Sequence, residues 1–370
     1  MNKIMTLLAP SRRIICRRLP SATLIKGTTL AFSNDATASY STDNSNNNNI
    51  NSNEQTFACL DLRASKLSVM ERLCLEECLL RHDDRQWLIW GIHHPTQSRY
   101  LQVSKLPDYI VQQQQQQQQS SSSNNCIVVM GIGGKPELLL DTDLIRQKGI
   151  WIIKRFSGGG TVVVDENCIY TTIIGRNQQL TDILPYPREI MQWTADAVFG
   201  PTFQDMKQSA LRKGTGNNNN NSMMYPDFEL KEHDYVLGGT KKVGGNAQSI
   251  VKTGWLHHTT FLWDYSEENM KYLTLPKKRP EYRKDREHSS FLIKLKNAYQ
   301  DQLEMNDFFQ SMETVCHDNF RLEPVTLDEA LSIMERVVGN KEDGSIATSN
   351  KHPIQAWFDG PGRTKIIDLK

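Results

Sequence analysis

Residues 150–165 of this chain read Ile150-Trp151-Ile152-Ile153-Lys154-Arg155-Phe156-Ser157-Gly158-Gly159-Gly160-Thr161-Val162-Val163-Val164-Asp165. A run rich in β-branched residues leads into two cations, a serine and three glycines, and a second β-branched run follows. This pattern predicts a strand, a tight turn and a strand. Each glycine costs about 0.5–1 kcal/mol relative to alanine in regular structure. The triplet therefore indicates backbone that needs unusual dihedral angles or lies against a ligand.

The side chains beside the triplet indicate an anionic ligand. Lys154, Arg155 and Ser157, together with free backbone N–H groups, have the chemistry of an anion site, and a phosphate is the anion that we expect. A Walker A loop and a dinucleotide fingerprint both run into a helix, whereas these glycines run into a predicted strand, so both are excluded. A plain hairpin turn with surplus glycine is the alternative interpretation of the triplet alone.

Composition limits the class of protein. The chain has 370 residues, 38% of them hydrophobic, and a net charge of +1. This suffices for a buried core, and the balanced charge gives no basic field, so we expect no nucleic-acid partner. No apolar run reaches the roughly 20 residues that cross a bilayer, so we expect no membrane partner. Seven scattered cysteines without Cys-x-x-Cys pairs argue against a disulfide framework and a zinc site.

The N-terminal region has the composition of a targeting segment. It carries repeated arginines and lysines with interleaved serine and threonine, and its first acidic residue is Asp35. This composition is typical of an organelle transit peptide, and the Asn-rich tract that follows is too polar to fold. We expect residues 1–52 to be a transit peptide and disordered linker, with mitochondrial localisation and the plastid as the alternative.

The pattern of the remaining chain predicts one folded domain, residues 53–322, and a short C-terminal extension, residues 323–370. Helical periodicity marks about 66–81, 187–198 and 306–320, and strand patterns mark 86–92, 100–103, 126–131, 168–174 and 254–262. Two low-complexity insertions, 112–125 and 214–222, are predicted to be expanded surface loops, because the entropy of loop closure grows only slowly with length.

A second stretch, residues 234–250, has the same pattern of strands, glycines and cations as the first. Asp234 opens a predicted strand, Lys241 and Lys242 follow a turn, and Gly244 and Gly245 enter another strand. The next strand carries His257 and His258. Because successive side chains on a strand point to opposite faces, we do not expect these histidines to share a metal ion.

With both stretches in place, the chain resembles the lipoate–protein ligase A family of the biotin/lipoyl ligase group. The matching residues occur in family order over about 73–320, and the plant-type branch is the most similar because of its Gly-Gly-Asn-Ala run. They are Glu76-Glu77-Cys78, Arg155, Ser157-Gly158-Gly159-Gly160, Asp165, Asp234, Lys241-Lys242, Gly244-Gly245-Asn246-Ala247, His257-His258-Thr259 and the segment 272–286.

The resemblance implies a biotin/lipoyl protein ligase-like α/β (α+β) fold with a mixed, mostly antiparallel sheet flanked by helices. It implies an enzyme that activates lipoate with ATP and Mg²⁺ to lipoyl-AMP and transfers the lipoyl group to a lysine of an acceptor protein. The implied acceptors are lipoyl domains of 2-oxoacid dehydrogenase complexes or the glycine-cleavage H protein.

The resemblance also implies the site. Lys242 is the expected catalytic residue, contacting the activated carboxyl and the phosphate. No residues are assigned to a metal, although Asp165 and Asp234 are the nearest carboxylates that could help to place Mg²⁺ or the incoming amine. The expected substrate and adenylate site comprises Arg155, Ser157, Gly158, Gly159, Gly160, Asn246, Ala247, Asp234, Asp165 and His258.

Departures from the family pattern keep other functions open. Val164 stands where the bacterial pattern has histidine, and bacterial ligases carry a larger C-terminal accessory domain, which a separate subunit could supply. The alternatives are a lipoyl or octanoyl transferase that uses a preformed donor, and a non-catalytic lipoate-binding regulator. Cys168 is the candidate nucleophile for a transferase, although its apolar neighbours favour a core position. Biotin ligation is less expected, because a Gly-Arg-Gly-Arg loop is absent.

Overall fold

The computed structural model describes residues 55–95, 98–103, 106–117, 126–214, 225–275, 279–339 and 351–369. The predicted transit peptide and linker, residues 1–52, lie outside the described residues, as do 118–125 and 215–222 of the two predicted insertions. The described residues belong to one compact unit, residues 51–370. Within them, no helix is both long and apolar enough to cross a membrane.

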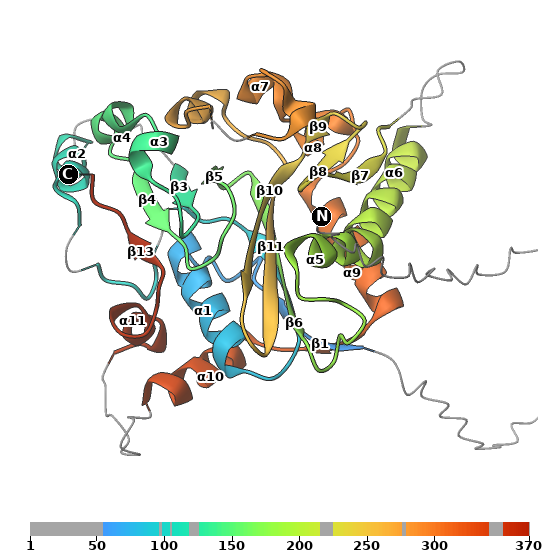
Figure 1. Ribbon diagram of the computed structural model, residues 1–370, viewed down its shortest axis with the longest axis horizontal. Coiled ribbons are helices and arrows are strands. Elements are labelled where there is room, and N and C mark those ends of the chain that lie inside the picture. The colour runs from blue at the N-terminus through green and yellow to red at the C-terminus, as the bar shows by residue number, and fades with distance from the viewer. Residues whose placement is uncertain are drawn as a thin grey trace, which may run out of the picture. The chain divides into compact units, whose positions relative to one another are not determined.

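The largest sheet has six strands in the order β10-β11-β6-β2-β1-β12 (Figure 1). Neighbours from β10 to β2 are antiparallel, whereas β1 is parallel to both β2 and β12. This mixed, mostly antiparallel sheet confirms the predicted fold class. Its strands are β1 (Thr56–Asp61), β2 (Trp87–Ile92), β6 (Cys168–Arg176), β10 (Gly244–Ile250), β11 (Gly254–Leu262) and β12 (Arg321–Pro324).

A second sheet carries the glycine triplet. It has four strands, β13 (Lys365–Ile366), β4 (Trp151–Lys154), β3 (Cys126–Met130) and β5 (Val162–Asp165), in that order. The strands before and after the triplet, β4 and β5, are therefore not paired, because β3 lies between them, parallel to β4 and antiparallel to β5. The hairpin interpretation of the triplet is wrong. Residues 155–161, the glycine loop, cross from one side of β3 to the other.

The third sheet contains the second predicted stretch. Strands β7 (Phe228–Lys231), β8 (Asp234–Leu237) and β9 (Lys241–Lys242) form an antiparallel meander. The turn between β8 and β9 has Gly238 and Gly239 at φ values of 56° and 68°, a left-handed backbone that glycine adopts readily. The chain then enters β10, as predicted.

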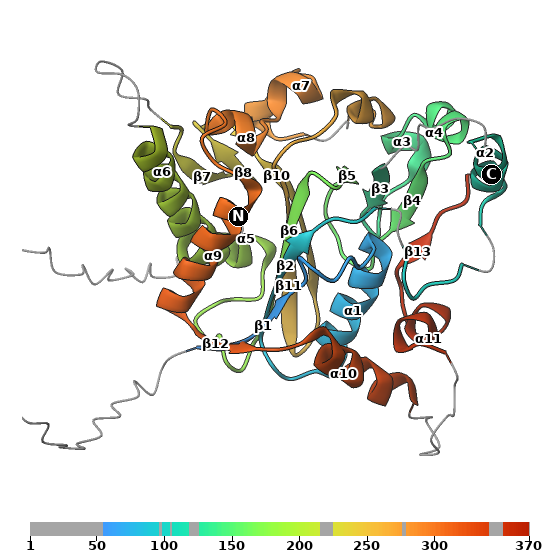
Figure 2. The same ribbon diagram turned by 180° about the vertical axis from the view of Figure 1, so that it is seen from behind.

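Helices cover both faces of the six-stranded sheet (Figure 2). One face packs against α1 (Val69–His82), α10 (Leu327–Gly339) and α11 (Pro353–Asp359). The other packs against α5 (Pro187–Thr194), the π-helical turn η1 (Ala195–Phe199), α6 (Gly200–Gly214) and α9 (Met305–Asn319). Successive side chains of β2 point to opposite faces of the sheet, as the two-residue period of a strand requires. Trp87 faces α1, and Leu88 faces α5 and α6.

The predicted first helix is α1, and a capping box starts it. The Ser68 hydroxyl accepts a hydrogen bond from the Glu71 N–H, and the Glu71 carboxylate accepts one from the Ser68 N–H. The other Glu71 oxygen accepts bonds from the backbone N–H groups of residues 99–101. The predicted strand at 100–103 is therefore wrong, because a side chain rather than a neighbouring strand satisfies this backbone.

Short elements complete the unit. They are α2 (Asp108–Gln117), α3 (Pro136–Leu139), α4 (Thr142–Lys148), η2 (Glu267–Tyr272), η3 (Glu281–Arg283), α7 (His288–Phe291) and α8 (Leu295–Ala298). Helix α2 extends to Gln117, so residues 112–117, predicted as loop, are helical. Glutamine is a good helix former, which accounts for the difference.

The residues after β12 pack into the same core as α1. Trp357 of α11 is fully buried. Strand β13 pairs with β4, and the Arg363 N–H donates to Glu77 Oε2 of α1 at 2.9 Å. The segment from α10 to β13 thus supports the strand that leads into the glycine loop.

Candidate ligand-binding and catalytic site

Three cavities meet where the glycine loop faces the start of β10. The largest has a volume of about 560 Å³ and the next about 390 Å³; we name them the outer apolar cavity and the outer polar cavity. The inner cavity, about 30 Å³, lies between the two larger sheets. Val162 and Gly245 line all three. The two outer cavities also share Gly159, Gly160, Thr161, Asp234 and Lys242.

The two outer cavities differ in the chemistry of their walls. The polar one is bounded by Pro187 and Met191 of α5 and by His233, Asn246 and Gln248. Aliphatic and aromatic side chains form most of the other, with a few polar groups among them, which is the usual composition of a small-molecule site. Its apolar wall consists of Leu138, Leu139, Val162, Val163, Leu262, Met270, Leu273, Phe291 and Leu292.

The glycine loop has backbone donors available for a ligand. Gly158 N–H donates to Gln248 O at 2.8 Å, which ties the loop to β10. Gly159 has a φ of 105°, and a Cβ there would lie 2.5 Å from Asn246 O, so this position requires glycine. Within the described residues, the N–H groups of Gly159 and Gly160 have no acceptor. Both residues line the two outer cavities, as an anion site would require.

Lys242 stands between the outer cavities in an ion pair. Its Nζ lies 2.5 Å from Asp234 Oδ1, and the two side chains are 22% and 7% exposed. The pairing of β8 with β9 brings the two residues together. The second oxygen, Asp234 Oδ2, accepts a hydrogen bond from the Tyr282 hydroxyl at 2.9 Å. Burial and the nearby carboxylate raise the pKa of Tyr282, so its hydroxyl remains a neutral donor.

Two further basic side chains line the outer apolar cavity. Arg283 is 5% exposed, and its Nη2 lacks a hydrogen-bond partner among the described residues. Its guanidinium lies over the Phe291 ring, 4.6 Å from the centroid. Burial, with smaller contributions from Arg283 and Lys242, lowers the pKa of His288 to about 4, so this imidazole is neutral at pH 7. Sequence reasoning missed His288 and included Arg283 only within the segment 272–286.

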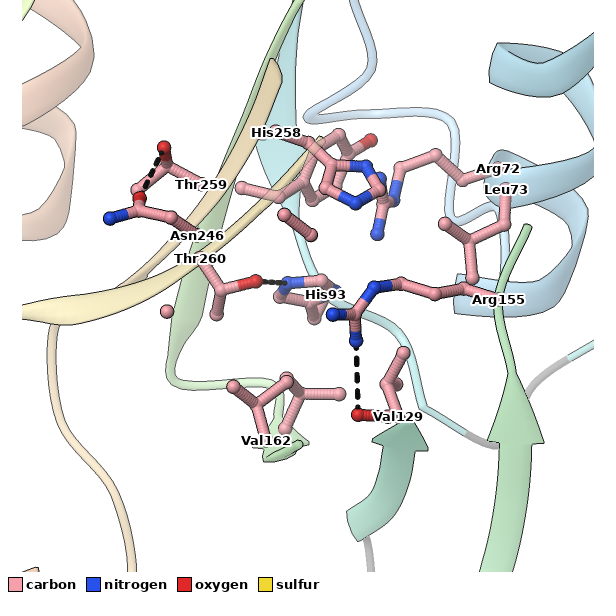
Figure 3. Close-up of a pocket in the computed structure, with 14 residues that line it drawn as sticks. Arg72, Leu73, His93, Val129, Arg155, Val162, Asn246, His258, Thr259 and Thr260 are labelled. Atoms are coloured by element: carbon pink, nitrogen blue, oxygen red, sulfur yellow. Dashed lines mark hydrogen bonds between the residues drawn. The ribbon is translucent and has the colours of Figure 1, made fainter. Parts of the chain in front are cut away.

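Arg155 points into the inner cavity (Figure 3). Its guanidinium donates to Ser157 Oγ at 3.1 Å and to the carbonyl oxygens of Val129, Gly158 and Gly160. Unlike Lys242, it lines only the inner cavity. Arg155 and Lys242, which were both expected at the adenylate, therefore line different cavities. By binding the carbonyl oxygens of Gly158 and Gly160, the guanidinium holds the glycine loop in shape.

Ser157, His258 and Glu76 form a buried chain of hydrogen bonds behind Arg155. Ser157 Oγ lies 2.9 Å from His258 Nε2, and His258 Nδ1 lies 3.2 Å from Glu76 Oε2. Burial lowers the pKa of His258, although Glu76 offsets part of that effect. Burial alone would raise the pKa of Glu76, but Arg72, His258 and Thr172 outweigh it and hold that pKa at about 2. The carboxylate is therefore ionised and the imidazole neutral.

His257 and His258 occupy opposite faces of β11, as predicted. His257 lies 3.0 Å from the Tyr235 hydroxyl and 3.1 Å from Gln248 Nε2, on the face that packs against α5 and α6. Burial lowers its pKa to about 3. Within the described ranges, no three His, Cys, Asp or Glu side chains are grouped as a metal site would need.

Two other expected site residues are adjacent to the glycine loop. Asn246 and Ala247 line both the inner cavity and the outer polar cavity. Asn246 Oδ1 accepts a hydrogen bond from the Thr259 hydroxyl at 2.9 Å, which fixes the amide at the cavity wall. These positions agree with a role in ligand binding.

Asp165 does not belong with the other expected residues. Its Oδ1 accepts the Asn167 N–H at 3.0 Å, and its Oδ2 accepts from Asn269 at 3.3 Å. The carboxylate therefore caps the turn between β5 and β6 and lines none of the three cavities. Cys168 beside it is fully buried, and burial raises the pKa of its thiol, which makes it a core residue rather than a nucleophile.

The fold and the site define a class: an α/β protein in which a glycine loop and a lysine border a polar and an apolar cavity. The family follows from the sequence. The model of the lipoyl protein ligase A/B catalytic domain matches residues 100–316, and the chain belongs to this family.

The chain is also similar to particular proteins and solved structures. "Inactive lipoate–protein ligase 2" of Plasmodium falciparum (isolate 3D7) is 29% identical over 285 residues, covering 72% of this chain and 71% of that protein. A bi-partite lipoate protein ligase of Thermoplasma acidophilum superposes with a TM-score of 0.47 at 14% identity, over 82% of this chain and 97% of that chain. A lipoate-protein ligase A bound with ATP gives 0.45 at 14% identity, over 82% and 99%.

Proposed function

We propose that this chain is an ATP-dependent lipoate–protein ligase that forms lipoyl-AMP and transfers the lipoyl group to a lysine of an acceptor domain. The observation that carries the proposal is the Lys242–Asp234 pair, which stands between the two outer cavities opposite the free N–H groups of Gly159 and Gly160. The two cavities together accommodate the lipoyl and adenylate parts, with the reacting carboxyl at Lys242.

In the first step, the carboxylate of lipoate attacks the α-phosphorus of ATP. A bond forms between a carboxylate oxygen and phosphorus, the bond to the bridging oxygen breaks, and pyrophosphate leaves. Such a reaction depends on alignment and charge screening rather than on an enzyme nucleophile. The Lys242 ammonium and the backbone donors of the glycine loop supply both.

In the second step, the ε-amine of the acceptor lysine attacks the lipoyl carbonyl carbon. The bond from that carbon to the phosphate oxygen breaks, AMP leaves, and the amine loses a proton. Lys242 stabilises the charge that develops on the carbonyl oxygen. Asp234 lines both outer cavities, and its Oδ1 accepts that proton once Lys242 has turned from it to the carbonyl oxygen.

The described residues do not fit a protein-held Mg²⁺ at this site. Asp234 uses one oxygen for Lys242 and the other for Tyr282, and no group of metal ligands lies nearby in the described ranges. The ion therefore belongs to the nucleotide substrate as its phosphate complex.

The proposed partners follow from the family chemistry. The acceptors are lipoyl domains of 2-oxoacid dehydrogenase complexes or the glycine-cleavage H protein, and residues 1–52 direct the chain to the mitochondrion. A separate accessory subunit that assists adenylation is part of the same proposal.

The decisive assay compares two adjacent lysines. The full chain is incubated with lipoate, ATP, Mg²⁺ and an apo lipoyl domain, and acceptor mass is measured. Lys242→Ala should reduce the rate at least 100-fold. Lys241→Ala is the control, because Lys241 Nζ binds Ser290 O and lines neither outer cavity. Equal rates for the two variants would refute the catalytic role of Lys242.

A transferase that uses preformed lipoyl-AMP is the second candidate, and a non-catalytic regulator is the third; the name of the P. falciparum relative, an inactive ligase, supports testing both against the ligase. Product from supplied lipoyl-AMP, but none from lipoate and ATP, would establish it in place of the ligase. Lipoate binding without product from either donor would identify a non-catalytic regulator.

A further inference from the structure

A separate groove, which we name the cationic groove, is lined by three basic side chains and no acidic one. Its volume is about 410 Å³. The cations are Lys154 at the end of β4 and Arg363 and Lys365 of the C-terminal segment, and the apolar side chains of Ile132 and Phe358 lie among them. Lys154 was expected to belong to the anion site of the glycine stretch, and the structure places it here instead.

The pairing of β13 with β4 at the edge of the four-stranded sheet (Figure 1) places two of these charges directly opposite each other. Lys365 is the partner of Lys154 in the antiparallel register, and like charges at opposed positions destabilise a sheet. No described carboxylate forms an ion pair with these lysines or with Arg363. The nearby carboxylates Glu77 and Asp359 pair with other basic side chains. The groove therefore favours an anionic partner from outside the chain.

Residues 132–134 connect the cationic groove with the outer apolar cavity. Ile132 lines the groove, and the next two residues line the cavity that Lys242 borders. The Lys154 Nζ donates a hydrogen bond to Gly134 O at 3.1 Å, which fixes this connection to the end of β4. A partner seated in the groove is therefore adjacent to the cavity that contains the proposed reaction site.

Exposed apolar side chains on the same surface indicate a protein partner. Ile132 in the groove is 47% exposed, and Leu138 in the wall of the outer apolar cavity is 58% exposed. A small anion would compensate the cations but leave both side chains in water. Protein interfaces combine apolar contacts with a charged rim, so a folded partner with an acidic surface covers both features.

We propose that the cationic groove is the docking surface of the acceptor domain, which places Asp or Glu side chains between Lys154, Arg363 and Lys365. The inference rests on the proposed function, because the partner is the acceptor of that reaction. Opposite charges accelerate the encounter and fix the orientation of the two proteins. The acceptor lysine then enters the outer apolar cavity and reaches the acyl group at Lys242.

Direct binding tests the docking surface without any chemistry. The probe is a fluorescently labelled apo lipoyl domain whose acceptor lysine is replaced by glutamine, and its anisotropy is measured against the full chain at low salt. Lys365→Glu should raise the Kd at least tenfold. The substitution places opposite charges across β4 and β13, so it should not weaken the fold. Added salt should weaken binding of the native chain more than that of the variant.

Lys252→Glu is the matched control, because it changes the net charge by the same amount. Lys252 is exposed in the turn between β10 and β11 and lines neither the groove nor the three cavities. Its Kd should stay within about twofold of the native value. Equal Kd values for Lys365→Glu and Lys252→Glu would overturn the proposal.

Charge exchange tests the chemistry of the partner. Replacing the acidic residues beside the acceptor lysine by lysine should weaken binding to the native chain and restore part of the binding to Lys365→Glu. Losses that simply add in the double variant would mean that these acidic residues do not contact the groove, which contradicts the proposal. Self-association of the full chain that Lys365→Glu abolishes would instead assign the groove to a second copy.

Kinetics separate this inference from the proposed function. Lys365→Glu should raise the KM for the unmodified apo lipoyl domain at least tenfold and leave kcat and the acceptor-free release of pyrophosphate from lipoate and ATP unchanged. Native modification kinetics together with an unchanged Kd would reject the docking surface and leave the proposed function standing. A native chain that binds the probe through Lys365 but yields no product from any donor would reject the proposed function and retain the docking surface.

Discussion

Glu76→Gln should destabilise the fold strongly, because Glu76 compensates a buried cation. Glu76 is 0% exposed and accepts from Arg72, Thr172 and His258. Its folded pKa is about 2, compared with the ordinary value of 4.5. At about 1.4 kcal/mol per pH unit, this difference corresponds to about 3 kcal/mol at pH 7. Removing one partner of a buried ion pair typically costs about 3–5 kcal/mol, which agrees with the value obtained from the pKa.

The lowered pKa of Glu76 also predicts how the free energy of unfolding changes with pH. Because the folded pKa lies below the unfolded one, the stabilisation is fully present above about pH 4.5 and is lost as the pH falls towards 2. The penalty of Glu76→Gln relative to the native chain should therefore shrink to about half at pH 3.

Urea unfolding followed by tryptophan fluorescence measures this penalty, since Trp87, Trp255 and Trp357 are all buried. Glu268→Gln is the control, because Glu268 is 76% exposed in a surface pair with Lys271, and its cost should stay below about 1 kcal/mol. A penalty for Glu76→Gln below about 1 kcal/mol at pH 7, or one that is unchanged at pH 3, would refute the reasoning.

Four further outcomes are expected. Gly159→Ala should lower acceptor modification at least tenfold through its positive φ and the clash with Asn246 O. Gly339→Ala, with open space at its Cβ and no place in the three cavities, should be neutral; equal rates would contradict the close approach. Trp357→Ala should cost about 3–5 kcal/mol in urea unfolding, because its ring is fully buried. Cys168→Ala should retain modification, and iodoacetamide labelling of the folded chain should spare Cys168, since the thiol is buried and its pKa raised. A fusion of residues 1–52 to a fluorescent reporter should enter mitochondria, and a cytosolic signal would reject the targeting prediction.

Local pattern determined much of the architecture. The helical periodicity of residues 66–81 and the strand patterns of β2, β6 and β11 are consequences of short-range geometry, which a sequence displays directly. The two glycine-and-cation stretches likewise marked the site, because Gly159, Gly160, Asp234 and Lys242 line the same two cavities. The family assignment agrees with the resemblance that these motifs carry.

Tertiary contacts determined where the charged side chains of the site point. A sequence places Arg155 beside the glycines, but only packing determines that its guanidinium binds the loop carbonyls and faces Arg72 instead of Lys242. Three other features also depend on segments that are far apart in the chain. They are the position of β3 between β4 and β5, the capping role of Asp165, and the position of His288 near Lys242. The sequence by itself therefore indicated most residues of a candidate cationic, glycine-rich site, although it included Asp165 and missed His288. The tertiary structure divided them into an outer and an inner site, because burial and hydrogen bonding across distant segments set where each charge points.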